Sequence, residues 1–143
     1  MAATAALLGT LLCTNADITF YTQQQIFWAN KYEANAAKLG EQQSLEEKYW
    51  DAYDDCYYAD DEKKVKINGV EQSNNDEAAA INYAHYKVKN FDQELLDELM
   101  NLDIEYETFK LMYETQLEAL RAQQEGEKTA TSTAAQDTGL LGG

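Results

Sequence analysis

The feature that most constrains this chain is a repeat of apolar side chains between Asn75 and Glu125. One row has its members seven positions apart, namely Ile81, Val88, Leu95, Leu102 and Phe109. A second row starts at Ala84 and Phe91, shifts by one position, and continues as Leu99, Tyr106, Tyr113 and Leu120. Apolar positions with this spacing share one face of an α-helix. The repeat predicts one unbroken helix over residues 75–125, with a face that another element must cover.

The first half of the chain offers a matching face. One row contains Tyr21, Trp28, Tyr49 and Cys56, with polar Asn35 and Gln42 in its two middle places, and its neighbour contains Tyr32, Leu39 and Tyr53. Both rows keep their register across Gly40, and Asn15 and Asp17 are good helix caps. We therefore expect one helix over about residues 18–60. The alternative is a break at Gly40–Ser44, where Ser44 and Glu47 form a capping box for a second helix.

Between the two helices, residues 63–72 predict a short turn or a mini β-hairpin. Lys63–Val70 alternates basic and β-branched residues up to the pair Asn68-Gly69, which favours a type I′ hairpin turn. A plain loop between helices is the alternative. Ser73–Glu77 then supplies caps and early acidic residues for the second helix. The predicted fold class is all-α, a long antiparallel two-helix hairpin with flexible ends.

Length and composition agree with this fold. A chain of 143 residues favours a single domain over 1–143. It contains no proline, although average usage would supply about seven, and this absence favours an almost entirely helical protein. Within the domain we expect an N-terminal docking arm at 1–16, the helical hairpin at 17–125, and a flexible or partner-bound tail at 126–143. The helix should end at Gly126, and Leu140–Gly143 is the part of the tail suited to insertion into a groove.

The charge of the chain is strongly negative and unevenly distributed. The net charge is −15, yet residues 1–40 sum to zero. Residues 41–75 carry ten acids and four lysines, and residues 76–128 carry thirteen acids and five bases. Such arms repel nucleic acid and anionic membranes, so we expect no direct nucleic-acid binding.

Several segments and residue types bear on where the protein works. No apolar run reaches the ~18 residues of a membrane span. Met1–Thr14 lacks a basic residue before its apolar patch, so we expect no secretion signal. Cys13 and Cys56 have no short spacing between them and are expected to be free thiols.

The sequence contains no candidate catalytic, cofactor-binding or metal-binding residues. Asp51–Glu62 is rich in acids, but Cys56 stands where a calcium loop needs glycine. His85, the single histidine, follows Asn82 rather than the glutamate of a di-iron Glu-x-x-His motif. The turn lacks the Trp-x-Gly signature of the secreted helical hairpins. We therefore expect no enzyme activity and no cofactor.

Apolar residues remain that a two-helix hairpin cannot cover. A further stripe lies beside the main repeat, and other aromatic residues lie near the turn or off the main row: Leu96, Met100, Ile104 and Leu111; Tyr57, Tyr58, Tyr83 and Tyr86; Phe27 and Trp50. A stripe wider than one partner helix indicates further helices, from other copies or from other structural proteins. The alternative is that residues 1–14 fold back over the excess.

The Asn-, Tyr- and Gln-rich, proline-free, cysteine-poor helices resemble those of small structural proteins of tailed-phage virions. The resemblance covers the two helical arms and implies a tail, neck or internal component, found in the virion or the host cytoplasm. It implies a homo-oligomer or a subunit bound to other structural proteins. Two alternatives come from other classes: an acidic nucleic-acid mimic that acts as an inhibitor or adaptor, and a secretion-system filament or substrate.

Overall fold

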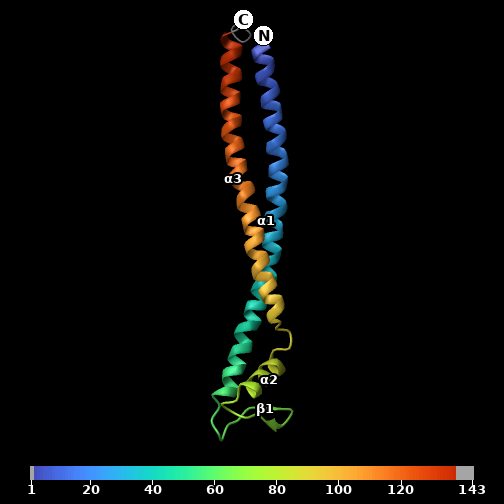
Figure 1. The fold of residues 1–143 in the computed structure, drawn as a ribbon, viewed down its shortest axis with the longest axis vertical. Coiled ribbons are helices and arrows are strands. Elements are labelled where there is room, and N and C mark those ends of the chain that lie inside the picture. The colour runs from blue at the N-terminus through green and yellow to red at the C-terminus, as the bar shows by residue number, and fades with distance from the viewer. Residues whose placement is uncertain (1, 138–143) are drawn as a thin grey trace. The chain divides into compact units, whose positions relative to one another are not determined.

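The computed structural model describes residues 2–137 (Figure 1). Along the chain these form α1 (Ala2–Tyr57), β1 (Lys66–Ile67), β2 (Val70–Glu71), α2 (Glu77–Lys87) and α3 (Gln93–Asp137). The fold is mostly helical, and α1 packs antiparallel to α3, which confirms the predicted fold class.

Contacts divide the chain into two units. Unit 1 pairs the described part of residues 1–33 with that of 104–143, and unit 2 comprises residues 34–103. In unit 1, α1 and α3 lie side by side in opposite directions (Figure 1). In unit 2, the last part of α1 packs with α2, the β-hairpin and the first turns of α3.

Helix α1 begins earlier than predicted and does not break. The expected start near residue 18 is wrong, because residues 2–16 are the first turns of α1 and not a separate docking arm. Thr4 and Thr14 are both buried. Thr14 continues the seven-residue row of Tyr21 and Trp28, and Thr4 continues the neighbouring row that contains Tyr32. The helix also passes through Gly40 without interruption, so the predicted continuity is confirmed. Since residues 2–14 extend α1, they do not fold back over the excess apolar surface.

The second long helix is interrupted where the sequence predicted continuity. Helix α2 ends at Lys87, and α3 begins only at Gln93, so the unbroken helix over residues 75–125 is wrong. Asp92 provides the physical reason, because its Oδ1 accepts a hydrogen bond from the backbone N–H of Leu95 at 3.2 Å and so caps α3. Phe91 and Leu96, on either side of this cap, are both buried in one cluster, as in a hydrophobic staple.

Helix α3 also continues beyond its predicted end. The helix runs through Gly126 to Asp137, so the described part of the predicted 126–143 tail is helical. An interior glycine costs about 1 kcal/mol, and contacts with α1 offset this cost. Thr14 Oγ1 donates to Glu127 Oε1 at 2.9 Å, and Ala135 is buried further along α3. The predicted role of Leu140–Gly143 lies outside the described residues.

The β-hairpin forms as the Asn-Gly pair predicted. Strand β1 pairs antiparallel with β2, with Lys66 opposite Glu71 and Ile67 opposite Val70. Asn68 and Gly69 have φ values of 49° and 82°, the positive values that a type I′ turn requires. Asp76 caps α2 by accepting from the backbone N–H groups of Ala78 and Ala79.

Candidate interaction surface

In unit 1 the predicted rows of α1 and α3 meet in an aromatic seam. Trp28 stacks on Phe109 with 4.5 Å between ring centroids, and Tyr106 lies 5.9 Å from Trp28. About two turns nearer the N-terminus of α1, the ring centroids of Tyr21 and Tyr113 lie 5.6 Å apart. These contacts confirm that the seven-residue rows face each other, and they bury rings whose edges remain near solvent.

Polar side chains continue the seam toward the N-terminus of α1. Gln124 Nε2 donates to Asn15 Oδ1 at 2.7 Å. Gln123 Nε2 donates to both Thr14 Oγ1, at 3.3 Å, and Glu127 Oε1, at 2.8 Å. The seam is therefore aromatic at Tyr21 and Trp28 and hydrogen-bonded toward the N-terminus of α1.

Unit 2 explains the polar gap in the first row. Asn35 is buried and donates from Nδ2 to the backbone carbonyl of Leu99 at 2.9 Å. Gln42 is also buried, and its Oε1 accepts from the backbone N–H of Asp92 at 3.3 Å. Both amides serve backbone groups at the start of α3. A buried polar side chain with a partner helps to fix one register between helices.

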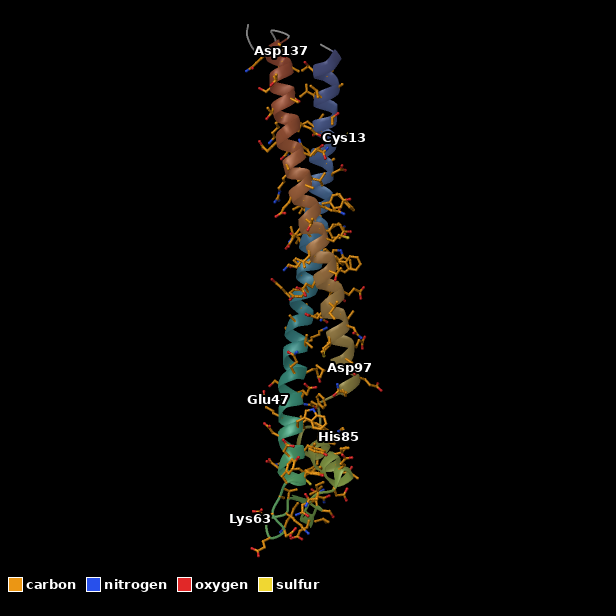
Figure 2. All side chains as sticks on the ribbon, turned by 60° about the vertical axis from the view of Figure 1, so that its left-hand side comes forward. Cys13, Glu47, Lys63, His85, Asp97 and Asp137 are labelled. Atoms are coloured by element: carbon orange, nitrogen blue, oxygen red, sulfur yellow. The ribbon has the colours of Figure 1, made fainter. Side chains whose placement is uncertain are left out.

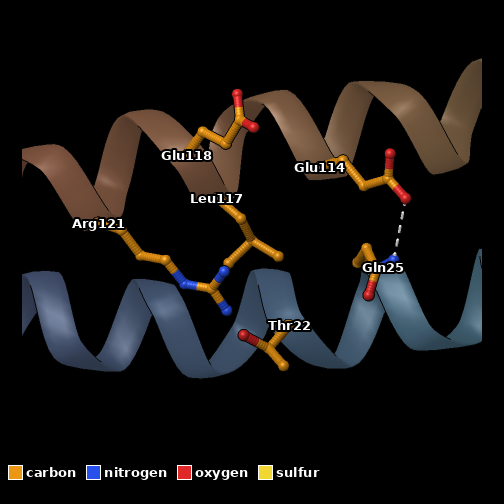
Figure 3. A pocket seen from close by; sticks show the side chains of 6 residues that line it. All are labelled: Thr22, Gln25, Glu114, Leu117, Glu118 and Arg121. Atoms are coloured by element: carbon orange, nitrogen blue, oxygen red, sulfur yellow. Dashed lines mark hydrogen bonds between the residues drawn. The ribbon is translucent and has the colours of Figure 1, made fainter.

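A shallow groove lies between the helices of unit 1, lined by Thr22, Gln25, Glu114, Leu117, Glu118 and Arg121 (Figure 3). Gln25 Nε2 donates to Glu114 Oε1 at 3.3 Å across it. Its open polar walls lack the apolar enclosure of small-molecule sites. Within residues 2–137, no group of three or more His, Cys, Asp or Glu side chains is arranged to hold a metal ion.

The two cysteines are free, as predicted, but their surroundings differ. Cys13 is exposed on the N-terminal half of α1 (Figure 2). Cys56 is fully buried in unit 2, and its Sγ donates to the backbone carbonyl of Ser73 at 3.7 Å. Burial raises the pKa of the Cys56 thiol above its ordinary value of 9.0, and the carboxylate of Asp76 raises it further. The thiolate, which is the reactive form, is therefore disfavoured at Cys56.

We expect a maleimide at neutral pH to label one cysteine per native chain, and two after denaturation in urea. The native label should map to Cys13, because the burial and raised pKa of Cys56 both slow its reaction. Intact-mass spectrometry measures the count, and Cys13→Ser supplies the control, which should take up no label until it unfolds. Equal native labelling of both cysteines would contradict the packing of unit 2.

The predicted surplus residues separate into buried and exposed groups. Leu96 is only 1% exposed and belongs to the core of unit 2, so its assignment to an uncovered stripe is wrong. Tyr83 is likewise buried. The large exposed members of the predicted surplus are Met100, Ile104, Leu111, Tyr58, Tyr86, Phe27 and Trp50. The displacement of Leu96 follows from the break at residues 88–92, which resets the helical register.

Exposed apolar side chains also lie on α1 of unit 1, and the seven-residue repeat does not predict most of them. We call this surface the outer face of α1 and define it by Leu12, Phe20, Ile26 and Phe27, which are 67%, 53%, 52% and 48% exposed. At about 100° per residue, these four positions fall within a sector of roughly 120° around the helix, on the side opposite the seam. Between Ala2 and Asn30, Asp17 is the only charged residue. In the sequence, this lack of charge is the feature that indicates an exposed apolar face on α1.

One charged group lies at the edge of the outer face. Lys31 Nζ is 5.5 Å from the centroid of the Phe27 ring, in the geometry of a cation–π contact. At its other end the face continues past exposed Cys13 and Leu8. The outer face is therefore neutral along its length and bounded by a lysine at one end.

Comparisons with known proteins returned no match: no protein-family model, no curated protein and no solved structure is similar to this chain. Among the helices of residues 2–137, none combines the length and the apolar character that a membrane crossing requires.

Proposed function

We propose that this protein is a structural subunit that packs with copies or partner proteins in a larger particle. The outer face of α1 is the observation that carries the proposal. Helix α1 of unit 1 has apolar side chains on two opposite sides, and α3 covers only one of them. A helix that is apolar on more than one side is ordinarily buried on more than one side.

The exposed apolar residues Leu12, Phe20, Ile26 and Phe27 gather on one side of α1. Single exposed apolar side chains are normal, whereas a contiguous neutral patch on an otherwise charged protein marks an interaction site. Here the patch lies on a chain of net charge −15. The charged arms keep the free subunit soluble, and the neutral face leaves one region where close packing meets no carboxylates.

The setting that we propose is a tailed-phage virion, as a tail, neck or internal component, which would locate the chain in the virion or the host cytoplasm. The composition of the two helical arms supports this setting, since they are rich in Asn, Tyr and Gln and free of proline.

In lysates of the cells that produce this protein, we expect the chain to sediment with a large particle at fixed stoichiometry. A Phe20→Asp/Phe27→Asp double variant should move to low-mass fractions, because two carboxylates on the outer face oppose its burial. Gradient sedimentation with quantitative mass spectrometry measures both. A matched control is Ile104→Asp/Leu111→Asp, which adds two carboxylates at exposed positions of α3 and should stay in the particle fractions.

Two results would contradict the proposal. One is a wild-type chain found only in low-mass fractions. The other is a small complex with one basic protein that dissociates as salt is raised, which would favour the acidic nucleic-acid mimic instead.

A further inference from the structure

We propose that the outer face of α1 binds the same face of a second copy, so that two α1 helices pack against each other about a two-fold axis. This inference rests on the proposed function as an assembly subunit, and it names the first partner. Three observations lead to it: the spacing of the face, its charge, and the contrast with the exposed residues of α3.

The spacing of the face indicates that its occupant is a helix. One row with a seven-residue period contains Cys13, Phe20 and Phe27, and a second contains Leu12, Thr19 and Ile26. The two rows lie about 100° apart around the helix, with Ala16 and Gln23 between them, and a stripe of that width is what a helix ordinarily buries against other helices. The same period governs the seam with α3. A second α1 presents rows of the same period, so the two faces can interlock over their whole length.

The charge of the face indicates which helix it accepts. A basic partner would gain little on a neutral surface and would bind instead to the acidic residues elsewhere on the chain. A second copy is itself highly acidic, and close approach through other surfaces would bring carboxylates together. The outer face avoids this repulsion, because Asp17 is the only acid between Ala2 and Asn30.

The exposed apolar residues of α3 in unit 1 do not have this property. Ile104 and Leu111 are 65% and 50% exposed, but acidic residues adjoin Ile104 on both sides. These neighbours are Asp103 and Glu105, and Glu107 follows one turn later. Two copies that met through α3 would therefore face each other's carboxylates, which disfavours this surface as the contact between copies.

The size of the face sets the expected strength of the pairing. Residues Leu8–Phe27 span roughly 30 Å of helix at 1.5 Å per residue. Standard stable interfaces bury about 800 Å² and involve roughly 20–30 residues per partner, more residues than one face of this helix segment presents. We therefore expect a reversible dimer that forms at micromolar concentrations and strengthens when the particle supplies further contacts.

Light scattering and sedimentation equilibrium on the purified full-length protein test the pairing. The wild-type mass should rise from monomer to dimer over a concentration range of about 1–100 μM. Phe20→Asp/Phe27→Asp should remain monomeric over that range. Ile104→Asp/Leu111→Asp is the matched control, because it makes the same change at two exposed positions of α3 and should still dimerise.

A second pair of variants keeps the test decisive if the aspartates disturb folding. Phe20→Gln/Phe27→Gln uses good helix formers, and it should raise the dissociation constant at least tenfold while the circular dichroism stays unchanged. Mixing Phe20→Lys/Phe27→Lys with Phe20→Asp/Phe27→Asp should restore a dimer that neither variant forms alone.

A wild-type chain that is monomeric throughout the range would overturn the inference, as would equal loss of dimer in the α3 control. Either result leaves the proposed function standing if the chain still sediments with a particle. Conversely, a dimer that never enters a particle would overturn the proposed function and retain the pairing.

Discussion

Replacing Leu96 by alanine is expected to lower the free energy of unfolding of unit 2 by about 3 kcal/mol, whereas Leu95→Ala should lower it by less than about 1 kcal/mol. The two leucines are neighbours in sequence, yet Leu96 is 1% exposed and Leu95 is 38% exposed. Leu96 packs in the cluster that contains Phe91 and Tyr49, so its truncation leaves a cavity. Leu95 points toward solvent and leaves none.

Hydrogen exchange with mass spectrometry measures this difference within unit 2. Peptides from α2 and from the first turns of α3 should exchange much faster in Leu96→Ala, and near the wild-type rate in Leu95→Ala. The control is matched, because both changes remove the same atoms and carry the same helix propensity.

The reverse result would restore the helix that the repeat alone predicted. In an unbroken helix over residues 75–125, Leu95 lies in the main apolar row with Val88 and Leu102, and Leu96 lies outside it. A large effect at Leu95 and a small one at Leu96 would therefore contradict the break at residues 88–92. The two variants therefore show which of the two leucines faces the core, and so whether the helix is broken.

The parts of the fold that depend on local spacing could be predicted from the sequence. The rows of α1, the continuity through Gly40 and the turn at Asn68-Gly69 are each specified by residues close together in the chain. The polar residues Asn35 and Gln42 lie on the inner face of α1, as their places in the seven-residue row predicted. Nothing in the sequence indicated that they would bond to the backbone of Leu99 and Asp92.

The break between α2 and α3 could not be read from the repeat, because the spacing of apolar residues across it mimics a helix. The competing signal was the cap: Asp92 between Phe91 and Leu96. The early start of α1 and the late end of α3 could not be predicted because the apolar pattern stops before the helices do. Thr14 and Glu127 are polar and interrupt an apolar pattern, yet they bond to each other across the seam.

The outer face of α1 does not follow from the seven-residue repeat, because that repeat places one apolar stripe on each helix. Phe27 was recognised as lying off the main row, but Leu12, Phe20 and Ile26 were not, since a second stripe on the same helix has no partner within the chain. Absence of charge over Ala2–Asn30, with Asp17 as the exception, was the more informative pattern.

The second large effect is expected at Trp28, which we compare with its neighbour Phe27. Trp28→Ala should lower the free energy of unfolding of unit 1 by about 3–5 kcal/mol, because it removes the ring that stacks on Phe109 and contacts Tyr106. Phe27→Ala should cost no more than about 1 kcal/mol, since its ring is 48% exposed on the other side of the helix. Hydrogen exchange of the α3 backbone amides beyond residue 104 measures the loss of stability in both variants.

Trp28→Phe distinguishes loss of packing from loss of the indole N–H. The Nε1 of Trp28 is buried without a hydrogen-bond acceptor among the described residues, so the N–H contributes a cost and not a bond. Phenylalanine keeps a ring against Phe109 and removes that cost, and Trp28→Phe should therefore be much less destabilising than Trp28→Ala. If the two were equally destabilising, an unseen partner of the indole would have to hold the seam together.

For dimerisation, we expect the order of effects to be reversed, with the Phe27 variant more affected than the Trp28 variant. Phe27→Ala removes a ring from the outer face, so it should weaken dimerisation while leaving unit 1 folded. Trp28→Phe keeps an aromatic ring beside Phe27, whose ring centroid lies 5.1 Å from that of Trp28, so it should leave the dimer unchanged at the same protein concentration. If changes at Trp28 alter mainly the free energy of unfolding and changes at Phe27 alter mainly dimerisation, then α1 has two separate apolar sides. If Phe27→Ala altered stability and not association, its ring would belong to the core of unit 1, and the outer face would lose its centre.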